Sequence, residues 1–174
     1  MEFLNTLKAR IPDYAKDIRL NLDGVVSRSS LDPADAAGAA LAAAFAARSK
    51  TIVDAIRSSG ALSDVDANAA LSAAALMGMN NIWYPYVDMA ADPDLKTQRA
   101  ELRMNVYATH GGVDKKRFEL FALAASIVGK CHFCVQSHYK MLKENGLTAQ
   151  QLRDVGRIAA VVQAAALAIS AEHG

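Results

Sequence analysis

Alanine dominates the apolar part of this 174-residue chain, and this feature limits its possible folds more than any other. Hydrophobic residues make up 52% of the sequence, yet only 6% of all residues are aromatic. Alanine has the highest helix propensity and lets helices approach one another closely. No segment alternates between apolar and polar residues for long enough to indicate a strand. The sequence therefore predicts an all-α fold.

Capping residues and helix breakers divide the chain into predicted helices. Ser63 and Asp114 are expected to cap two of them, and Pro85 is expected to end the helix that Ser63 begins. The predicted helices cover residues 2–10, 12–25, 33–47, 50–59, 64–84, 96–107, 115–128, 132–145 and 149–171.

The two halves of the chain resemble each other. Residues 17–21 (DIRLN) are similar to residues 101–105 (ELRMN), at an offset of 84 residues. Such self-similarity is typical of a duplicated unit, and only the second copy contains cysteines. We predict a single domain over residues 1–174, with approximate internal repeats at 12–90 and 96–174.

Charge and hydropathy exclude several classes of protein. The chain has 19 basic and 18 acidic residues, a net charge of +1, which argues against a nucleic-acid surface or a polybasic membrane patch. Its first residues lack the pattern of a signal peptide, and Arg48 and Lys50 interrupt the alanine run well short of a membrane span. We expect a cytoplasmic protein, in which a C-x-x-C pair is redox-active or metal-binding more often than structural.

Most of the reactive side chains are concentrated in residues 130–138, which contain both cysteines and two of the four histidines. One helical pattern ends just before this stretch, and another resumes within it. Cys131 is therefore expected at a helix start, Cys134 about one turn later on the same face, and His138 one further turn along.

The predicted helix start at the cysteine pair favours reactive thiols. The start of a helix carries unpaired N–H groups and the positive end of the helix dipole, which stabilise a thiolate. Lys130 adds a cation, and His138 can accept the thiol proton. Only a thiolate is a good nucleophile, so we predict thiol chemistry at this pair. The helix start favours Cys131 as the more acidic thiol, whereas His138, four residues after Cys134, favours Cys134.

A zinc site is the main alternative. Cys131, Cys134 and His138 could supply three ligands. Glu119 or His132 could then supply the fourth. Structural zinc modules usually bring a second ligand pair from a distant segment, and this chain has no other cysteine.

Glu119 is the carboxylate best placed to take part. It lies among Phe118, Leu120 and Phe121, on the predicted helix that precedes the cysteines. A carboxyl group in apolar surroundings can relay protons. The sequence equally allows Glu119 to be an exposed surface residue.

These residues resemble those of the alkyl hydroperoxidase D (AhpD) family, of the carboxymuconolactone decarboxylase-like superfamily. The pattern that carries the resemblance is Glu119 followed by the C-x-x-C pair and His138. Further similar stretches are residues 12–18, 20–22, 77–81 and 102–105. The resemblance extends over nearly the whole chain and is much more specific than a lone C-x-x-C. Decarboxylase chemistry, known from the wider superfamily, is disfavoured by the cysteine pair.

The resemblance implies an all-helical homotrimer and a thiol-dependent peroxidase that binds no metal, haem or other cofactor. The Cys131–Cys134 pair would cycle between dithiol and disulfide. Cys134 would attack the peroxide and become a sulfenic acid, and Cys131 would donate a proton and then resolve that acid. His138 and Glu119 would form a proton relay. On this basis we take Cys134 as the attacking residue.

The reductant that the resemblance implies is a dihydrolipoyl group on a partner protein. That partner would be a dihydrolipoyl acyltransferase of the 2-oxoacid dehydrogenase type, with dihydrolipoamide dehydrogenase as the source of electrons. The peroxiredoxin AhpC is a second implied partner. The predicted function is thus a lipoyl-dependent alkyl hydroperoxide reductase. The alternatives are a zinc-binding structural module and a dithiol–disulfide reductase without peroxidase activity.

The chain departs from the family pattern at two positions. Some members carry histidine directly before the second cysteine, where this chain has Phe133. His132 lies one position earlier and is expected to point elsewhere, so it does not inherit that role. Lys130 replaces the glycine expected before the first cysteine. These changes bear on the proton relay more than on the dithiol chemistry.

Overall fold

The computed structural model describes residues 1–173, and over that range it contains helices and no strands, which confirms the all-α prediction. Short 3-10 or π turns lie at Asp13–Ala15, Asp23–Ser27 and His110–Gly112. The ten α-helices of the described residues are α1 (Glu2–Lys8), α2 (Lys16–Leu22), α3 (Pro33–Ala46), α4 (Lys50–Ser58), α5 (Asp64–Ala90), α6 (Pro93–Thr97), α7 (Val106–Thr109), α8 (Lys115–Val128), α9 (His132–Glu144) and α10 (Ala149–His173).

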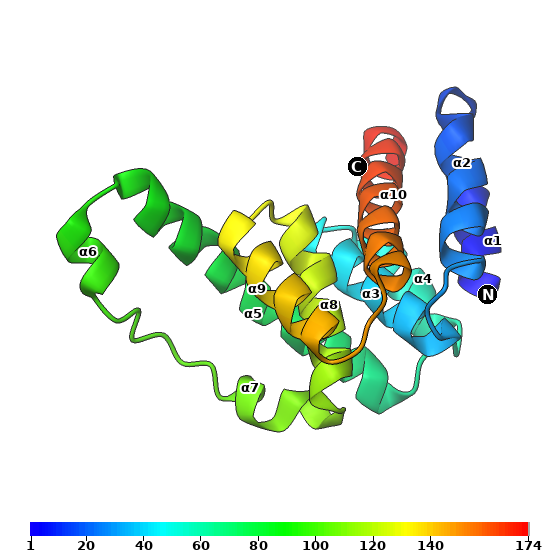
Figure 1. Ribbon diagram of the computed structural model, residues 1–174. Helices are drawn as coiled ribbons and strands as arrows, with labels where there is room; N and C mark the ends of the chain where they lie inside the picture. Colours follow the sequence, from blue (N-terminus) through cyan, green and yellow to red (C-terminus); the bar gives the residue numbers. More distant parts are fainter. Residues whose placement is uncertain (174) are drawn as a thin grey trace.

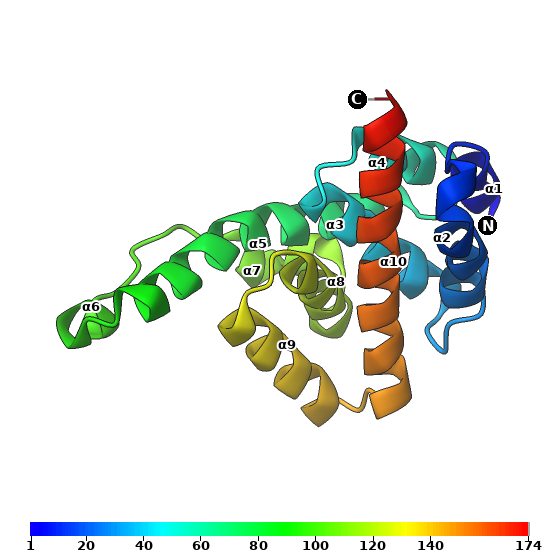
Figure 2. The same ribbon diagram turned by 90° about the horizontal axis from the view of Figure 1, so that it is seen from above.

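Helices α3, α5, α8 and α10 form the centre of the molecule (Figure 1). Helices α1 and α2 lie along one side, where α2 packs against α10, and α9 packs against α8 and α5 (Figure 2). The C-terminal part of α5 and the short α6 extend away from this centre as an arm in both views. The chain then returns from the tip of the arm to α7.

Small residues let the central helices pack closely. Residues 36–44 of α3 are all buried, so this helix is covered on every side. Gly38 lies against the Phe121 ring of α8, and a Cβ atom at that position would stand 2.2 Å from the Phe121 Cε1 atom. The two helices can approach this closely only because position 38 has no side chain.

Arg117 of α8 joins three of the central helices. Its Nε donates to Asp35 of α3 at 2.7 Å, and its NH1 donates to Asp66 of α5 at 2.9 Å. Burial raises the pKa of Asp35 although the guanidinium opposes the change. The Ser63 hydroxyl accepts from the Asp66 N–H and donates to the Asp66 carboxylate, which confirms Ser63 as the predicted cap of α5.

The α3–α4 and α8–α9 connections have the same backbone geometry. Arg48 and Lys130 both adopt left-handed φ angles, of 59° and 55°. Each is followed by the residue that caps the next helix, Ser49 for α4 and Cys131 for α9. In both turns the capping residue's N–H bonds the carbonyl five residues earlier, as in a Schellman motif. We retain as a proposal the internal duplication, with its repeats at 12–90 and 96–174.

Two of the predicted helix boundaries were wrong. Helix α5 does not end before Pro85 but continues to Ala90, because a helix of 27 residues tolerates the loss of one backbone hydrogen bond. Residues 98–105, predicted to be helical, form no helix. They connect the tip of the arm to α7 (Figure 1), and an extended chain covers about 3.3 Å per residue against about 1.5 Å for a helix.

Helix α10 is long and apolar enough to pass a length-and-composition test for a membrane span, over Ala149–Glu172. Half of the tested window is buried within the protein. The helix packs against α3, α8 and α2 (Figure 2), as a core helix does.

Asp154 fastens the loop before α3 to α10. Its buried carboxylate accepts hydrogen bonds from the Ser30 N–H and hydroxyl, both at 2.8 Å, and from Arg153 and Arg157. Burial alone would raise the pKa of Asp154, but these hydrogen bonds outweigh it and lower the pKa to about 2.

Replacing Asp154 by Asn is expected to lower the free energy of unfolding by about 2 kcal/mol at neutral pH. Because the folded-state pKa lies below the ordinary value, the contribution is present above about pH 4 and disappears as the pH falls toward 2. Urea denaturation at several pH values would measure this, with exposed Asp17→Asn as the control. An equal loss at pH 7 and pH 2.5 would contradict the assignment.

Replacing Gly38 by Ala is expected to destabilise the protein by about 1 to 3 kcal/mol, because the new methyl group meets the Phe121 ring. Gly156→Ala in α10 is the matched control, since a Cβ atom at that position would meet nothing within 4 Å. That variant is expected to gain up to about 1 kcal/mol from helix propensity. Chemical denaturation of both proteins would test the contrast, and a stabilised Gly38→Ala protein would refute it.

Candidate active site

The turn between α8 and α9 places Cys131 at the start of α9, as predicted. Cys131 is the N-cap residue, and its Sγ accepts a hydrogen bond from the backbone N–H of Cys134 at 3.2 Å. This contact satisfies one of the unpaired N–H groups at the helix start. Both cysteine side chains are buried, with exposed fractions of 0% and 2%.

Cys131 and Cys134 are joined by a disulfide, with their Cα atoms 5.3 Å apart. A separation of three residues at a helix start brings the two side chains to the same face, as the spacing indicates. The chain's two cysteines are thus both in the oxidised form of a dithiol pair.

His138 and Glu119 form a buried pair beside the disulfide. The His138 Nδ1 atom lies 2.5 Å from Oε2 of Glu119, and the two residues are 6% and 4% exposed. When Glu119 is ionised its carboxylate can only accept, and the His138 Nδ1–H is then the donor of this hydrogen bond. The alternative of an exposed Glu119 is therefore wrong. On its other side, the His138 Nε2 atom lies 3.2 Å from the Met77 Sδ atom.

A cavity of about 530 Å³ opens onto His138. Its lining includes Cys134 and His138 but not Cys131. Apolar groups form much of the remaining wall, among them Met104, Tyr107 and Phe133. A small molecule in the cavity would therefore meet Cys134 rather than Cys131. The spacing left both cysteines as candidates for the reactive thiol, and the cavity reaches only Cys134.

Tyr107 of α7 is a site residue that the sequence did not single out. It lines the cavity, and its ring packs edge-on against Phe118 of α8 with centroids 5.5 Å apart. Burial raises the pKa of the Tyr107 phenol, and the neighbouring Glu119 carboxylate raises it further. Position 107 gave no signal because the surrounding residues were predicted to continue a helix from residue 96.

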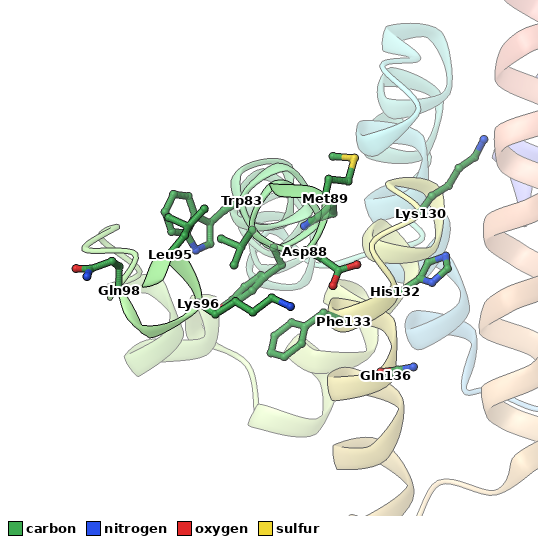
Figure 3. Close-up of a pocket in the computed structure, with 13 residues that line it drawn as sticks. Trp83, Asp88, Met89, Leu95, Lys96, Gln98, Lys130, His132, Phe133 and Gln136 are labelled. Atoms are coloured by element: carbon green, nitrogen blue, oxygen red, sulfur yellow. The ribbon is translucent and has the colours of Figure 1, made fainter. Parts of the chain in front are cut away.

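A second, outer groove of about 690 Å³ lies between the arm and α9 (Figure 3). Phe133 projects into it and stacks on Tyr84 of α5, with ring centroids 4.3 Å apart. Both residues also line the inner cavity, so this aromatic pair separates the two spaces. His132 is exposed and points away from the Phe133 ring (Figure 3), as expected.

The described residues contain no group of three or more His, Cys, Asp or Glu side chains arranged to hold a metal ion. In the proposed zinc set, both cysteine sulfurs are bonded to each other. Glu119 contacts His138, whereas His132 lies on the exposed side of α9.

Comparison with known proteins shows the family of this chain. The model of the carboxymuconolactone decarboxylase family matches residues 93–172, which include the whole site described above except the residues of α5. Alkyl hydroperoxide reductase AhpD of Rhodospirillum centenum is 44% identical over 97% of this chain and 91% of its own length. The chain belongs to the AhpD family. Two other AhpD proteins, from Bradyrhizobium sp. and Brucella canis, are 42% and 39% identical over 97% of the chain, covering 93% and 97% of their own lengths.

The structure gives a reason for another AhpD-like stretch, residues 77–81. The Asn81 side chain donates to the Ala125 carbonyl of α8 at 3.3 Å. Gly129, at the end of α8, leaves room for it, since a Cβ atom there would lie 2.0 Å from the Asn81 Nδ2 atom. These contacts hold α5 against the turn that leads into the cysteine pair.

The structure also explains why glycine suits the position before the first cysteine. Lys130 has a φ of 55°, a left-handed conformation in which glycine carries no steric penalty. Lys130→Gly is therefore expected to raise the free energy of unfolding by about 1 kcal/mol. Arg48→Gly, at the corresponding turn after α3, is the matched variant and is expected to gain a similar amount.

Thermal or urea denaturation of the oxidised proteins would measure both changes. If Lys130→Gly lowers stability while Arg48→Gly raises it, Lys130 stabilises the site through its side chain and the strain argument fails at that position.

Proposed function

We propose that this protein is an alkyl hydroperoxide reductase that uses Cys131 and Cys134 as a redox-active dithiol. The observation that carries the proposal is the disulfide, which lies beside the buried His138–Glu119 pair. A cavity opens onto Cys134 of this disulfide, and the chain belongs to the AhpD family. The relatives named above are themselves called alkyl hydroperoxide reductases.

In the first step, the Cys134 thiolate attacks the terminal oxygen of a hydroperoxide, ROOH. The O–O bond breaks, Cys134 becomes a sulfenic acid, and the departing alkoxide takes a proton to leave as ROH. His138, oriented by Glu119, accepts the proton of the Cys134 thiol beforehand. Cys131 is the proton donor to the alkoxide. Access supports these roles, because Cys134 lines the cavity and Cys131 does not.

In the second step, the Cys131 sulfur attacks the sulfenic acid of Cys134. A disulfide forms, and the departing hydroxide takes up the proton that His138 accepted from Cys134 and leaves as water, which gives the covalent state that the structure contains. A dihydrolipoyl group then reduces the disulfide by thiol exchange and leaves as the oxidised lipoyl group. The two electrons that reduce the hydroperoxide thus come from the lipoyl dithiol.

We assign this lipoyl group to a dihydrolipoyl acyltransferase, with dihydrolipoamide dehydrogenase restoring its reduced form. AhpC is proposed as a second partner, and the cytoplasm as the location.

We also propose a homotrimer. The arm supports it, because Ile82, Tyr86 and Met89 of α5 expose apolar side chains there that a neighbouring copy could cover.

The proposal is tested by following hydroperoxide consumption by metal-free protein, with and without dihydrolipoamide. Wild type is expected to turn over only with dihydrolipoamide and to lose two thiols on oxidation. Cys134→Ser is expected to reduce turnover to background, because the nucleophile is gone. Cys131→Ser is the matched control and is expected to consume one equivalent of hydroperoxide, leaving a sulfenic acid that dimedone labels on Cys134.

Three results would contradict this assignment. Labelling of Cys131 in Cys134→Ser would reverse the roles of the two cysteines. Turnover of disulfides but not of hydroperoxides would make the protein a dithiol–disulfide reductase. Stoichiometric zinc, with thiols that react only after chelation, would make it a zinc-binding module.

A further inference from the structure

We infer that Met104 is a second peroxide-reactive site of the cavity, whose thioether a bound alkyl hydroperoxide oxidises to the sulfoxide while the cysteine pair is a disulfide. The inference rests on the proposed function for the identity of the oxidant. Met104 lies on the stretch that returns from the arm to α7 (Figure 1), and its half-buried side chain packs against the core. It lines the same cavity as Cys134 and His138.

The cavity presents two sulfur atoms of different reactivity. Among the described residues that line it, Cys134 and Met104 carry sulfur, and the others carry no group that a hydroperoxide oxidises readily. In the reduced protein, the Cys134 thiolate is the stronger nucleophile and takes the hydroperoxide. In the disulfide form, the Cys134 sulfur is bonded to Cys131. Met104 is then the remaining nucleophile at the cavity.

Asn80 of α5 is placed to stabilise the sulfoxide. Its side-chain amide donates to the Met104 Sδ atom at 3.6 Å, and Asn80 itself is 7% exposed. A thioether sulfur is a weak hydrogen-bond acceptor, whereas a sulfoxide oxygen is a strong one. An oxygen added to Sδ therefore gives this buried amide a better partner than it has in the unoxidised protein. The contact both orients the Met104 sulfur and stabilises the product of its oxidation.

The oxidation balances without a further co-reactant. A lone pair of the Met104 sulfur attacks the terminal oxygen of ROOH, so that an S–O bond forms while the O–O bond breaks and the alkoxide departs. The proton on the transferred oxygen then passes to the alkoxide, which leaves as ROH. The thioether loses two electrons and becomes a sulfoxide, and the hydroperoxide gains them and becomes an alcohol.

Oxidation of Met104 changes the wall that a substrate meets. Methionine sulfoxide is a polar, chiral side chain in place of a flexible apolar one. Tyr107 and Phe133 line the same cavity, so the polar group would stand among apolar surfaces that suit an alkyl group. We expect the oxidised protein to bind alkyl hydroperoxides less well, with KM rising several-fold. The modification would thus lower turnover once hydroperoxide has exceeded the supply of dihydrolipoyl reductant.

Two other methionines supply internal controls. Met141 of α9 is also half-buried, and its Sδ atom also accepts from an asparagine amide, that of Asn145 at 3.3 Å. It lines neither the cavity nor the outer groove. Met77 contacts His138 but is fully buried and does not line the cavity. A comparison of Met104 with Met141 therefore isolates the effect of the cavity.

The test exposes wild-type protein with its disulfide intact to cumene hydroperoxide and follows sulfoxide formation at each methionine by peptide mass spectrometry. Met104 is expected to oxidise about tenfold faster than Met141, because binding in the cavity raises the effective concentration of the hydroperoxide. Met77 is expected to stay unoxidised. Excess dihydrolipoamide is expected to protect Met104, since the Cys134 thiolate then consumes the hydroperoxide.

The effect on activity is measured by removing the hydroperoxide and then assaying turnover with dihydrolipoamide. Wild type is expected to lose activity in proportion to Met104 oxidation. Met104→Leu, which is close in volume and cannot form a sulfoxide, is expected to keep its own starting activity after the same treatment. Met141→Leu is the matched control and is expected to lose activity as wild type does.

Equal rates of oxidation at Met104 and Met141 would overturn the inference, as would equal losses of activity in Met104→Leu and wild type. If Met104 is oxidised selectively but untreated wild type consumes no hydroperoxide with dihydrolipoamide, the modification site stands and the proposed function fails. If untreated wild type is active and Met104 is not oxidised selectively, the proposed function stands and the inference fails.

Discussion

The close contact between α3 and α8 is the constraint on which the rest of the structure depends. Gly38 allows the Phe121 ring to lie directly on the α3 backbone, and the buried alanines around it let α5 and α10 approach the same axis. Helix α8 is therefore packed on most of its surface. The face of α8 that carries Glu119 is held against α9 because the opposite face has no freedom to move.

The site combines a helix start with a helix face. The Schellman turn that ends α8 places Cys131 at the N-cap of α9, where its sulfur meets a free N–H group. The next turns of α9 carry Cys134 and His138 inward, toward the carboxylate of Glu119. The corresponding turn after α3 has the same backbone but ends in Ser49. One turn geometry thus serves as a simple helix cap in the first half and presents a dithiol in the second.

Burial determines what each polar group of the site can do. Glu119 and His138 are both nearly inaccessible to solvent, so a proton can pass directly between them only through their contact with each other. The cavity exposes Cys134 to a small molecule and leaves Cys131 covered. Phe133 closes one wall of that cavity by stacking on Tyr84. The outer groove beyond it remains open along the arm.

The sequence by itself determined the all-α class, most helix boundaries, and the local geometry of the cysteine pair. These features depend on capping residues, breakers and spacings of three or four residues, which act within one or two helical turns. The tertiary structure decided that Glu119 is buried on His138, that Tyr107 lines the cavity beside His138, and that residues 98–105 form no helix. Those outcomes depend on contacts between α5, α7, α8 and α9, and on the distance that the chain must cover from the arm. The local sequence pattern carries no information about these contacts or this distance, because both are set by how separate helices pack together.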